Sequence, residues 1–204
     1  MNAPRDTLRA TGLVALLLAP PVAQACGYED PNSATFQRGV LNWSYPNALY
    51  VQGAVTQAIL DRTIEPPAAT RKKDLFGSGF RSAANRLNQF GSELQPGDTD
   101  EFAFTLVLIE PMLWSRYAVG EGTVGVSTHV KGPQRGDLVV VTAEAALEEI
   151  VSHRLSWERA EELGLVRFYG DPVQAARLRA LAATPAARQQ LPAQPGPHGL
   201  IERA

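Results

Sequence analysis

Apolar residues recur at helical spacing in the first half of the chain. Between residues 48 and 59 they stand three or four positions apart, at Ala48, Val51, Val55, Ala58 and Ile59. This stripe predicts an amphipathic helix, which the Pro-Pro pair at 66–67 brings to an end. A second helix is predicted over residues 80–94, where apolar and polar side chains occupy opposite sides.

The pattern changes to that of strands after residue 100. Residues 102–109 are almost continuously apolar, which is typical of a strand covered on both faces. Residues 124–130 alternate between apolar and small or polar side chains, so that one face is apolar. Shorter runs at 114–117, 138–141 and 165–169 predict further strands, separated by turns that contain glycine or proline.

Four residues predict where the later helices begin. Thr142 and Ser156 are suitable N-caps, and Asp171 followed by Pro172 combines an N-cap with proline in the first turn. The resulting order is two helices, three or four strands, a helix, a short helix, a strand and a last helix. This order predicts an α+β fold in which helices pack on a mostly antiparallel sheet.

The ends of the chain lack this periodicity. Residues 1–25 combine two arginines, a short apolar run and a final Ala-Gln-Ala, the organisation of an export signal. Residues 26–46 are rich in aromatic residues and predict an extended arm, and a single domain follows at 47–185. Residues 186–204 are rich in proline, glutamine and alanine and predict a flexible tail. We therefore expect a periplasmic or secreted protein.

The only cysteine, Cys26, directly follows the predicted cleavage site, and two interpretations of it remain open. Lipoprotein processing would cut before Cys26 and attach a lipid to it, which would anchor the protein to a membrane. Ordinary cleavage after Ala25 would leave a free thiol at the mature N-terminus. A single cysteine cannot form an internal disulfide, so the core must be stable without one.

The charge balance gives no reason to expect a nucleic acid as partner. The chain has 19 Lys and Arg and 21 Asp and Glu side chains, a formal charge of −2 at pH 7. Removal of residues 1–25 takes away two arginines and one aspartate, which makes the charge −3. Because the composition is not basic, we expect contact with a membrane only through a lipid on Cys26.

Residue types that carry catalysis or bind metals do not form recognisable motifs. The histidines, His129, His153 and His198, are far apart and lack the His-x-x-x-His spacing of metal sites. Glutamates gather between residues 144 and 162, at positions that predict solvated helix surfaces. We therefore expect no catalytic set, no metal site and no cofactor. An enzyme is a third hypothesis, which would require His129 or His153 to meet Asp or Glu in a cleft.

Residues 137–171 resemble the C-terminal half of sterol-carrier-protein-2-like domains. In those domains a strand and a helix lead through a Gly-basic-Leu-(Ser/Asn/Asp) step to a short helix, a glycine, a strand and Gly-Asp. Here Arg154-Leu155-Ser156, Ala160, Gly164 and Gly170-Asp171 occupy the corresponding positions, and a helix follows to about residue 181. His153 replaces the first glycine, which predicts a differently built turn.

The resemblance implies a shell of sheet and helices around an apolar tunnel that holds a lipid or similar ligand, without catalytic groups. The side chains expected to line it are Phe104, Leu106, Leu108, Trp114, Val126 and Trp157. The same six residues would be ordinary core in a protein without a ligand. The predicted function is a non-enzymatic binding or carrier module for an apolar small molecule or lipid.

A second hypothesis concerns the aromatic residues of the arm and its junction with the domain, Tyr28, Phe36, Trp43, Tyr45 and Tyr50. If exposed, they would dock the protein on an enzyme or transporter of the cell envelope, because Tyr and Trp are common anchors of interfaces. If packed against their own domain, they would belong to its core, since a large apolar patch in solvent is unusual.

Overall fold

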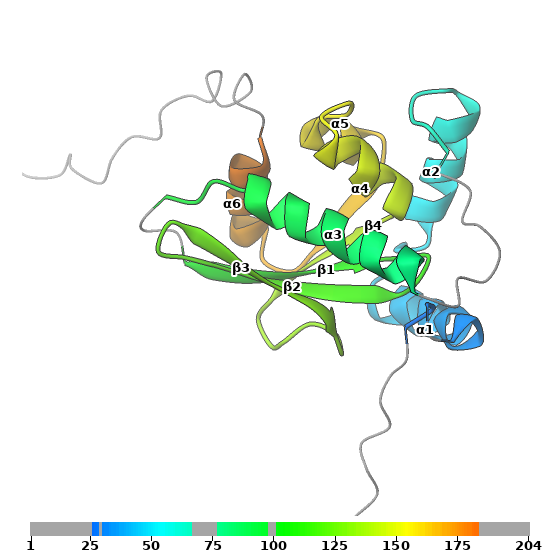
Figure 1. Ribbon diagram of the computed structural model, residues 1–204, viewed down its shortest axis with the longest axis horizontal. Coiled ribbons are helices and arrows are strands. Elements are labelled where there is room, and N and C mark those ends of the chain that lie inside the picture. Colours follow the sequence, from blue (N-terminus) through cyan, green and yellow to red (C-terminus); the bar gives the residue numbers. More distant parts are fainter. Residues whose placement is uncertain (1–25, 29, 67–76, 98–100, 184–204) are drawn as a thin grey trace, which may run out of the picture.

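A five-stranded sheet in the order β3-β2-β1-β4-β5 forms the centre of the protein (Figure 1). The computed structural model describes residues 26–28, 30–66, 77–97 and 101–183. The strands are β1 (Phe102–Leu108), β2 (Leu113–Gly120), β3 (Thr123–Val130), β4 (Leu138–Thr142) and β5 (Val166–Tyr169). Strands β1 and β4 run parallel, and the other neighbouring pairs are antiparallel. The mostly antiparallel sheet is therefore confirmed.

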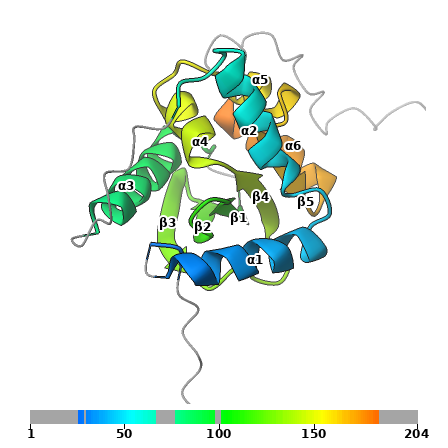
Figure 2. The ribbon, with the colours of Figure 1, turned by 90° about the vertical axis from the view of Figure 1, so that its right-hand side faces the viewer.

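Helices cover both sides of this sheet. They are α1 (Pro31–Ser44), α2 (Tyr50–Leu60), α3 (Ser78–Glu93), α4 (Glu144–Val151), α5 (Trp157–Glu162) and α6 (Pro172–Ala182). Helices α3, α4 and α5 lie over one face, and α1 lies on the opposite side (Figures 1 and 2). This arrangement confirms the predicted α+β fold. None of the helices in the described ranges is long and apolar enough to cross a membrane.

The segment predicted as an extended arm is mostly helical. Helix α1 begins after Asp30, whose side chain accepts a hydrogen bond from the backbone amide of Asn32 at 3.0 Å. Its buried side is formed by Ala34, Gln37 and Leu41. The prediction of an arm is wrong over this helix, because small and polar residues hide the helical period.

The aromatic residues of this region divide into two groups. Tyr28 and Tyr45 pack against the core. Phe36, Trp43 and Tyr50 are 75%, 87% and 63% exposed. Packing against the domain therefore accounts for the first group only. The predicted export signal and flexible tail, residues 1–25 and 186–204, lie outside the described residues.

Two of the three predicted N-caps are present. Ser156 and Asp171 accept hydrogen bonds from backbone amides in the first turns of α5 and α6. Thr142 instead belongs to β4, where its hydroxyl donates to the backbone oxygen of Leu165 at 2.9 Å. Helix α4 starts one residue later, after Ala143. The prediction of Thr142 as a cap is wrong because its hydroxyl bonds to the backbone oxygen of Leu165 instead of to an amide of α4.

His153 closes the turn after α4 with a φ of 55°. This left-handed conformation is the one that glycine commonly supplies at a helix C-terminus. Across the turn, the backbone amides of Arg154 and Leu155 both donate to the backbone oxygen of Glu149. Histidine therefore adopts here the left-handed conformation that favours glycine.

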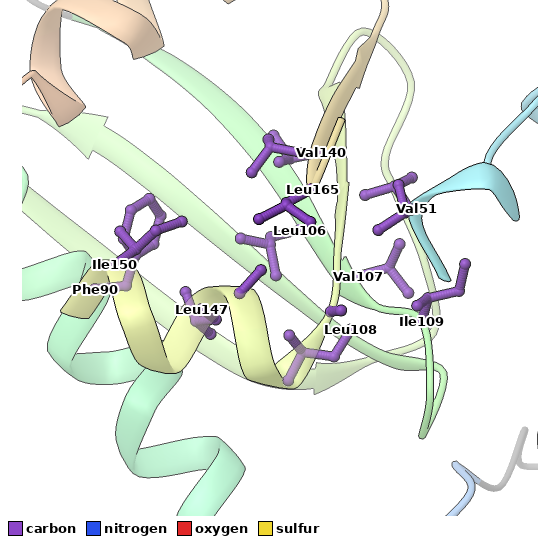
Figure 3. Packing of buried hydrophobic residues seen from close by; sticks show 14 of the residues in the cluster. Val51, Phe90, Leu106, Val107, Leu108, Ile109, Val140, Leu147, Ile150 and Leu165 are labelled. Atoms are coloured by element: carbon purple, nitrogen blue, oxygen red, sulfur yellow. The ribbon is translucent and has the colours of Figure 1, made fainter. Parts of the chain in front are cut away.

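The apolar core is continuous around β1 and β4. Every residue of β4 is buried, as are the last five residues of β1. Figure 3 shows Leu147 and Ile150 of α4 on the side of β1 where Leu106 lies, whereas Val51 of α2 lies with Val107 on the other side. The core thus has apolar residues on both sides of the sheet.

Candidate ligand-binding site

The register of the sheet places most of the predicted lining residues on one face. Phe104, Leu106 and Leu108 alternate along β1 and are at most 1% exposed, on the face covered by α3 and α4. Val126 of β3 shares this face, because it pairs with Tyr117, which in turn pairs with Phe104.

Trp114 lies on the opposite face of the sheet. Its partner on β1 is Val107, which alternates with Leu106 and Leu108. The indole ring contacts Tyr45 instead, with the ring centroids 6.5 Å apart. Trp114 therefore does not line the same site as the other predicted residues. The turn before β2 decides which side chains of this strand point to which face of the sheet. The periodicity of the sequence does not reveal that turn.

Aromatic rings form a continuous band beneath α3 and α5. Phe104 stacks on Tyr117 with centroids 4.5 Å apart, and Phe90 meets Tyr117 edge-on at 5.7 Å. Trp157 stacks on Phe90 at 5.2 Å and lies 5.9 Å from Phe168. Two predicted residues, Phe104 and Trp157, thus belong to one aromatic band. The other three members, Phe90, Tyr117 and Phe168, were not predicted from the sequence, although Phe90 continues the apolar side of its helix.

Two hydrogen-bonding atoms within this layer have no partner among the described residues. They are the indole nitrogen Nε1 of Trp157 and the hydroxyl oxygen of Ser115, whose side chains are buried. The hydroxyl of Tyr117, by contrast, donates to the backbone oxygen of Leu87 at 2.9 Å. Leaving a buried donor unpaired costs about 1–3 kcal/mol. Within this layer, the indole nitrogen of Trp157 is therefore a buried hydrogen-bond donor that no described residue satisfies.

Helix α3 approaches the sheet very closely at Gly91. A Cβ atom on this residue would overlap with Cγ2 of Val126 and would lie 3.3 Å from a ring carbon of Tyr117. Such a close approach leaves no room for a side chain at this position. The glycine therefore sets the distance between the helix and the aromatic band.

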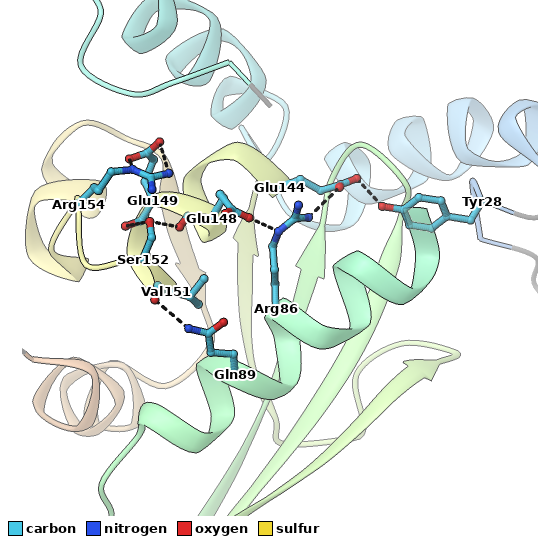
Figure 4. A network of polar contacts seen from close by, with 9 residues as sticks. All are labelled: Tyr28, Arg86, Gln89, Glu144, Glu148, Glu149, Val151, Ser152 and Arg154. Atoms are coloured by element: carbon cyan, nitrogen blue, oxygen red, sulfur yellow. Dashed lines mark hydrogen bonds and ion pairs between the residues drawn. The ribbon is translucent and has the colours of Figure 1, made fainter. Parts of the chain in front are cut away.

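A polar network lies along α3 and α4 at the border of the apolar layer (Figure 4). The hydroxyl of Tyr28 donates to Glu144 at 2.8 Å, and Arg86 pairs with both Glu144 and Glu148. Burial raises the pKa of Glu144, while the hydrogen bond from Tyr28 and the charge of Arg86 oppose this shift. The prediction of solvated glutamates is wrong for Glu144, whose side chain is 24% exposed, whereas that of Glu148 is 41% exposed.

Glu149 departs further from that prediction, since it is only 3% exposed. Its carboxylate accepts hydrogen bonds from the Arg154 guanidinium at 2.8 and 3.1 Å and from the backbone amide of Glu65 at 3.2 Å. The hydrogen bonds from Arg154 lower the pKa of Glu149. These contacts join α4 to the segment after α2, which is a structural role.

Glu110 supplies the N-terminal cap of α4 from the turn between β1 and β2. Its carboxylate accepts a hydrogen bond from the backbone amide of Glu144 at 3.1 Å. Burial raises the pKa of Glu110 to about 7, although this hydrogen bond opposes the shift. The guanidinium of Arg38 donates to the backbone oxygen of Glu110 at 2.8 Å, which connects α1 to the same turn.

The predicted absence of a metal site can be compared only with the described residues. In that part of the chain, no group of three or more His, Cys, Asp or Glu residues is placed to hold a metal ion. His129 lies edge-on to Phe80 at 5.6 Å, and His153 has Glu93 at 3.9 Å. His198 lies outside the described ranges.

Cys26 is packed into the core rather than displayed at the end of an arm. The residue is 2% exposed, and the next backbone amide, that of Gly27, donates to the backbone oxygen of Pro111 at 2.6 Å. A lipid on the sulfur would require the thiol to leave this packed position. Both interpretations of Cys26, the lipidated residue and the free thiol, stay predictions.

No family model and no curated protein matches the chain. Solved structures that match include sterol carrier protein 2, at 18% identity over 48% of this chain and 87% of that chain, with a TM-score of 0.37. Sterol carrier protein 2 like 2 from Aedes aegypti matches at 17% identity over 50% of this chain and 97% of its own, also with a TM-score of 0.37.

A different kind of protein also appears among the matches. The sec-alkylsulfatase Pisa1 from Pseudomonas sp. matches at 16% identity over 58% of this chain, with a TM-score of 0.34. This chain spans only 19% of the length of that alkylsulfatase. None of these similarities assigns a ligand or an activity. The matches to sterol carrier protein 2 structures cover about half of this chain.

Proposed function

We propose that this protein is an exported, non-enzymatic binding or carrier module for an apolar, lipid-like molecule. The ligand is held between helices α3–α5 and the sheet face that carries Phe104, Leu106 and Leu108. The observation that carries the proposal is the indole nitrogen of Trp157, a buried donor without a partner inside the aromatic band. A molecule with one polar atom on an apolar body would satisfy this donor.

Apolar contact would supply most of the affinity of such a ligand. Burial of about 300 Å² of an acyl chain contributes on the order of 7 kcal/mol. A single hydrogen bond contributes roughly 0.5–1.5 kcal/mol. The Trp157 indole therefore fixes where the polar atom of the ligand lies and adds only a modest part of the binding free energy.

Trp157→Phe is expected to weaken the binding of a long-chain fatty acid about 2- to 12-fold, because the aromatic ring remains while the hydrogen bond is lost. The measurement is a titration of the purified protein with a fluorescent long-chain fatty acid. Native mass spectrometry of the same preparation shows whether a lipid accompanies the protein from the producing cells.

Trp114→Phe is the matched control, because this indole lies on the other face of the sheet. It should leave the affinity unchanged. Equal losses in both variants would show that the indole nitrogen of Trp157 makes no special contact. The absence of both a co-purified lipid and saturable fatty-acid binding would refute the proposed function.

Export rests on the order of charged, apolar and small residues in residues 1–25. We expect the mature protein to begin at Cys26 with an unmodified thiol, because that side chain is packed into the core. Intact mass measurement of protein from the periplasmic and membrane fractions checks both points. A diacylglycerol on Cys26 would contradict the free thiol, and a mass that includes residues 1–25 in all fractions would contradict cleavage.

A further inference from the structure

Helix α1 carries an apolar face that no described residue covers. Phe36, Val40 and Trp43 are 75%, 45% and 87% exposed, and their spacing of four and three residues places them on one side of the helix. The exposed residues of α1 are all uncharged: Asn32, Thr35, Phe36, Gly39, Val40, Trp43 and Ser44. We call this surface the α1 apolar face. A contiguous exposed patch of this kind marks an interaction site.

We propose that the α1 apolar face binds the same face of a second copy of this chain, with the two helices antiparallel about a two-fold axis. In such a pair, residues equally distant from the midpoint between Gly39 and Val40 meet each other. Phe36 then meets Trp43 of the second copy, and Thr35 meets its Ser44. Gly39 meets its Val40. In these pairs an aromatic ring meets an aromatic ring, a hydroxyl meets a hydroxyl, and the smallest residue meets a larger one.

The centre of this pair combines a small residue with a larger one. Space is open above Gly39, because a Cβ atom added there would meet nothing within 4 Å. Val40 of the second copy can therefore fill the hole over Gly39, and the reverse contact follows from symmetry. On either side, the rings of Phe36 and Trp43 gain the extra stability of aromatic pairs.

The absence of charge favours a second copy over a membrane surface. A helix that lies in a membrane interface usually carries Lys and Arg along its polar side. The one basic residue of α1, Arg38, instead donates hydrogen bonds to the backbone oxygen of Glu110 and the hydroxyl of Thr35. A face without charges also brings no like charges together across a two-fold axis.

The size of the face predicts a weak dimer. Three exposed side chains of this type bury on the order of 400 Å² in each copy. A total of about 800 Å² lies below that of stable complexes, so association should depend on concentration. Helix α1 lies on the opposite side of the sheet from α3 and α5 (Figure 2). The inference does not depend on the proposed ligand.

Sedimentation velocity of the full chain, as purified from the producing cells, tests the proposal over a concentration series. The wild type should shift from monomer to dimer. Trp43→Asp should raise the dissociation constant at least about tenfold, because it removes the ring contact with Phe36 of the second copy and places a carboxylate against that apolar ring. The matched control is Val173→Asp on α6, which is also exposed and lies outside the face. It should leave the dissociation constant unchanged.

Cysteine cross-linking tests the antiparallel register. A mixture of Thr35→Cys and Ser44→Cys chains should give more mixed disulfide dimers than either variant gives with itself. Wild type, whose Cys26 is buried, measures the background. A monomeric wild type at every concentration, or a dimer that Trp43→Asp leaves intact, would overturn the proposal. So would binding of a monomer to neutral phosphatidylcholine vesicles that Trp43→Asp abolishes.

Discussion

Gly91→Ala lowers the free energy of unfolding by about 1–3 kcal/mol, the usual effect of forcing an atom into a filled core. The new methyl group would overlap with Val126 and press against Tyr117, so α3 must move away from the sheet. Alanine has a higher helix propensity than glycine, which by itself would stabilise the helix by roughly 1 kcal/mol. The expected loss is the net effect after this gain.

Gly53→Ala in α2 separates propensity from packing. A Cβ atom on Gly53 would meet nothing within 4 Å, so alanine there should stabilise the protein by about 0.5–1 kcal/mol. Urea unfolding of the two variants and the wild type measures both effects. If Gly91→Ala also proved stabilising, the tight contact between α3 and the sheet would be refuted.

The protein is expected to lose up to about 3 kcal/mol of stability as the pH rises from about 4.5 to about 7, through Glu110. Burial raises the pKa of this carboxyl from 4.5 to about 7 in the folded state. Between these values the folded state holds a proton that the unfolded state has released. Stability from this group is therefore complete below the unfolded pKa and is lost as the pH passes the folded pKa.

Glu110→Gln should remove this part of the pH dependence, because glutamine keeps a hydrogen-bond acceptor for the cap of α4 without a titrating proton. At pH 8 we expect the variant to be more stable than the wild type by roughly 2–3 kcal/mol, with little difference near pH 4.5. Glu121→Gln, which removes an exposed carboxylate between β2 and β3, is the control. Parallel curves for wild type and Glu110→Gln in urea unfolding from pH 4.5 to 8 would contradict the assignment.

The two proposed contacts of this protein lie on opposite sides of its sheet. The aromatic band includes Phe90 of α3 and Trp157 of α5. Helix α1 lies on the other side of the sheet from these two helices (Figure 2). Trp43→Asp should therefore leave fatty-acid binding intact, and Trp157→Phe should leave the dimer intact. This separation allows each proposal to fail without affecting the other.

The candidate site was only partly accessible from the sequence. Alternation along β1 placed Phe104, Leu106 and Leu108 on one face, because period two follows from the geometry of a strand. The prediction that Trp114 lines the same site is wrong. A shift of one residue along β2 moves every side chain of the strand to the other face of the sheet. The partnerless indole of Trp157 could not be inferred, because hydrogen bonding depends on neighbours distant in the sequence.

Local chemistry of the sequence determined most of the secondary structure. The caps Ser156 and Asp171 and the apolar runs of the strands act within a few residues, so they can be recognised without knowing the tertiary structure. They predicted the order of elements and the α+β class. Helix α1 was missed because its period is carried partly by alanine and glutamine, and its burial depends on the sheet beneath it.

Tertiary structure decided which of these elements meet and what their contacts do. The raised pKa of Glu110, the tight approach at Gly91 and the burial of Cys26 all arise between segments far apart in the chain. Periodicity shows that a residue faces the interior or the solvent, but it does not identify its neighbours. The sequence by itself therefore determined the elements and the fold class, and the packing of those elements decided the site and the exposed face of α1.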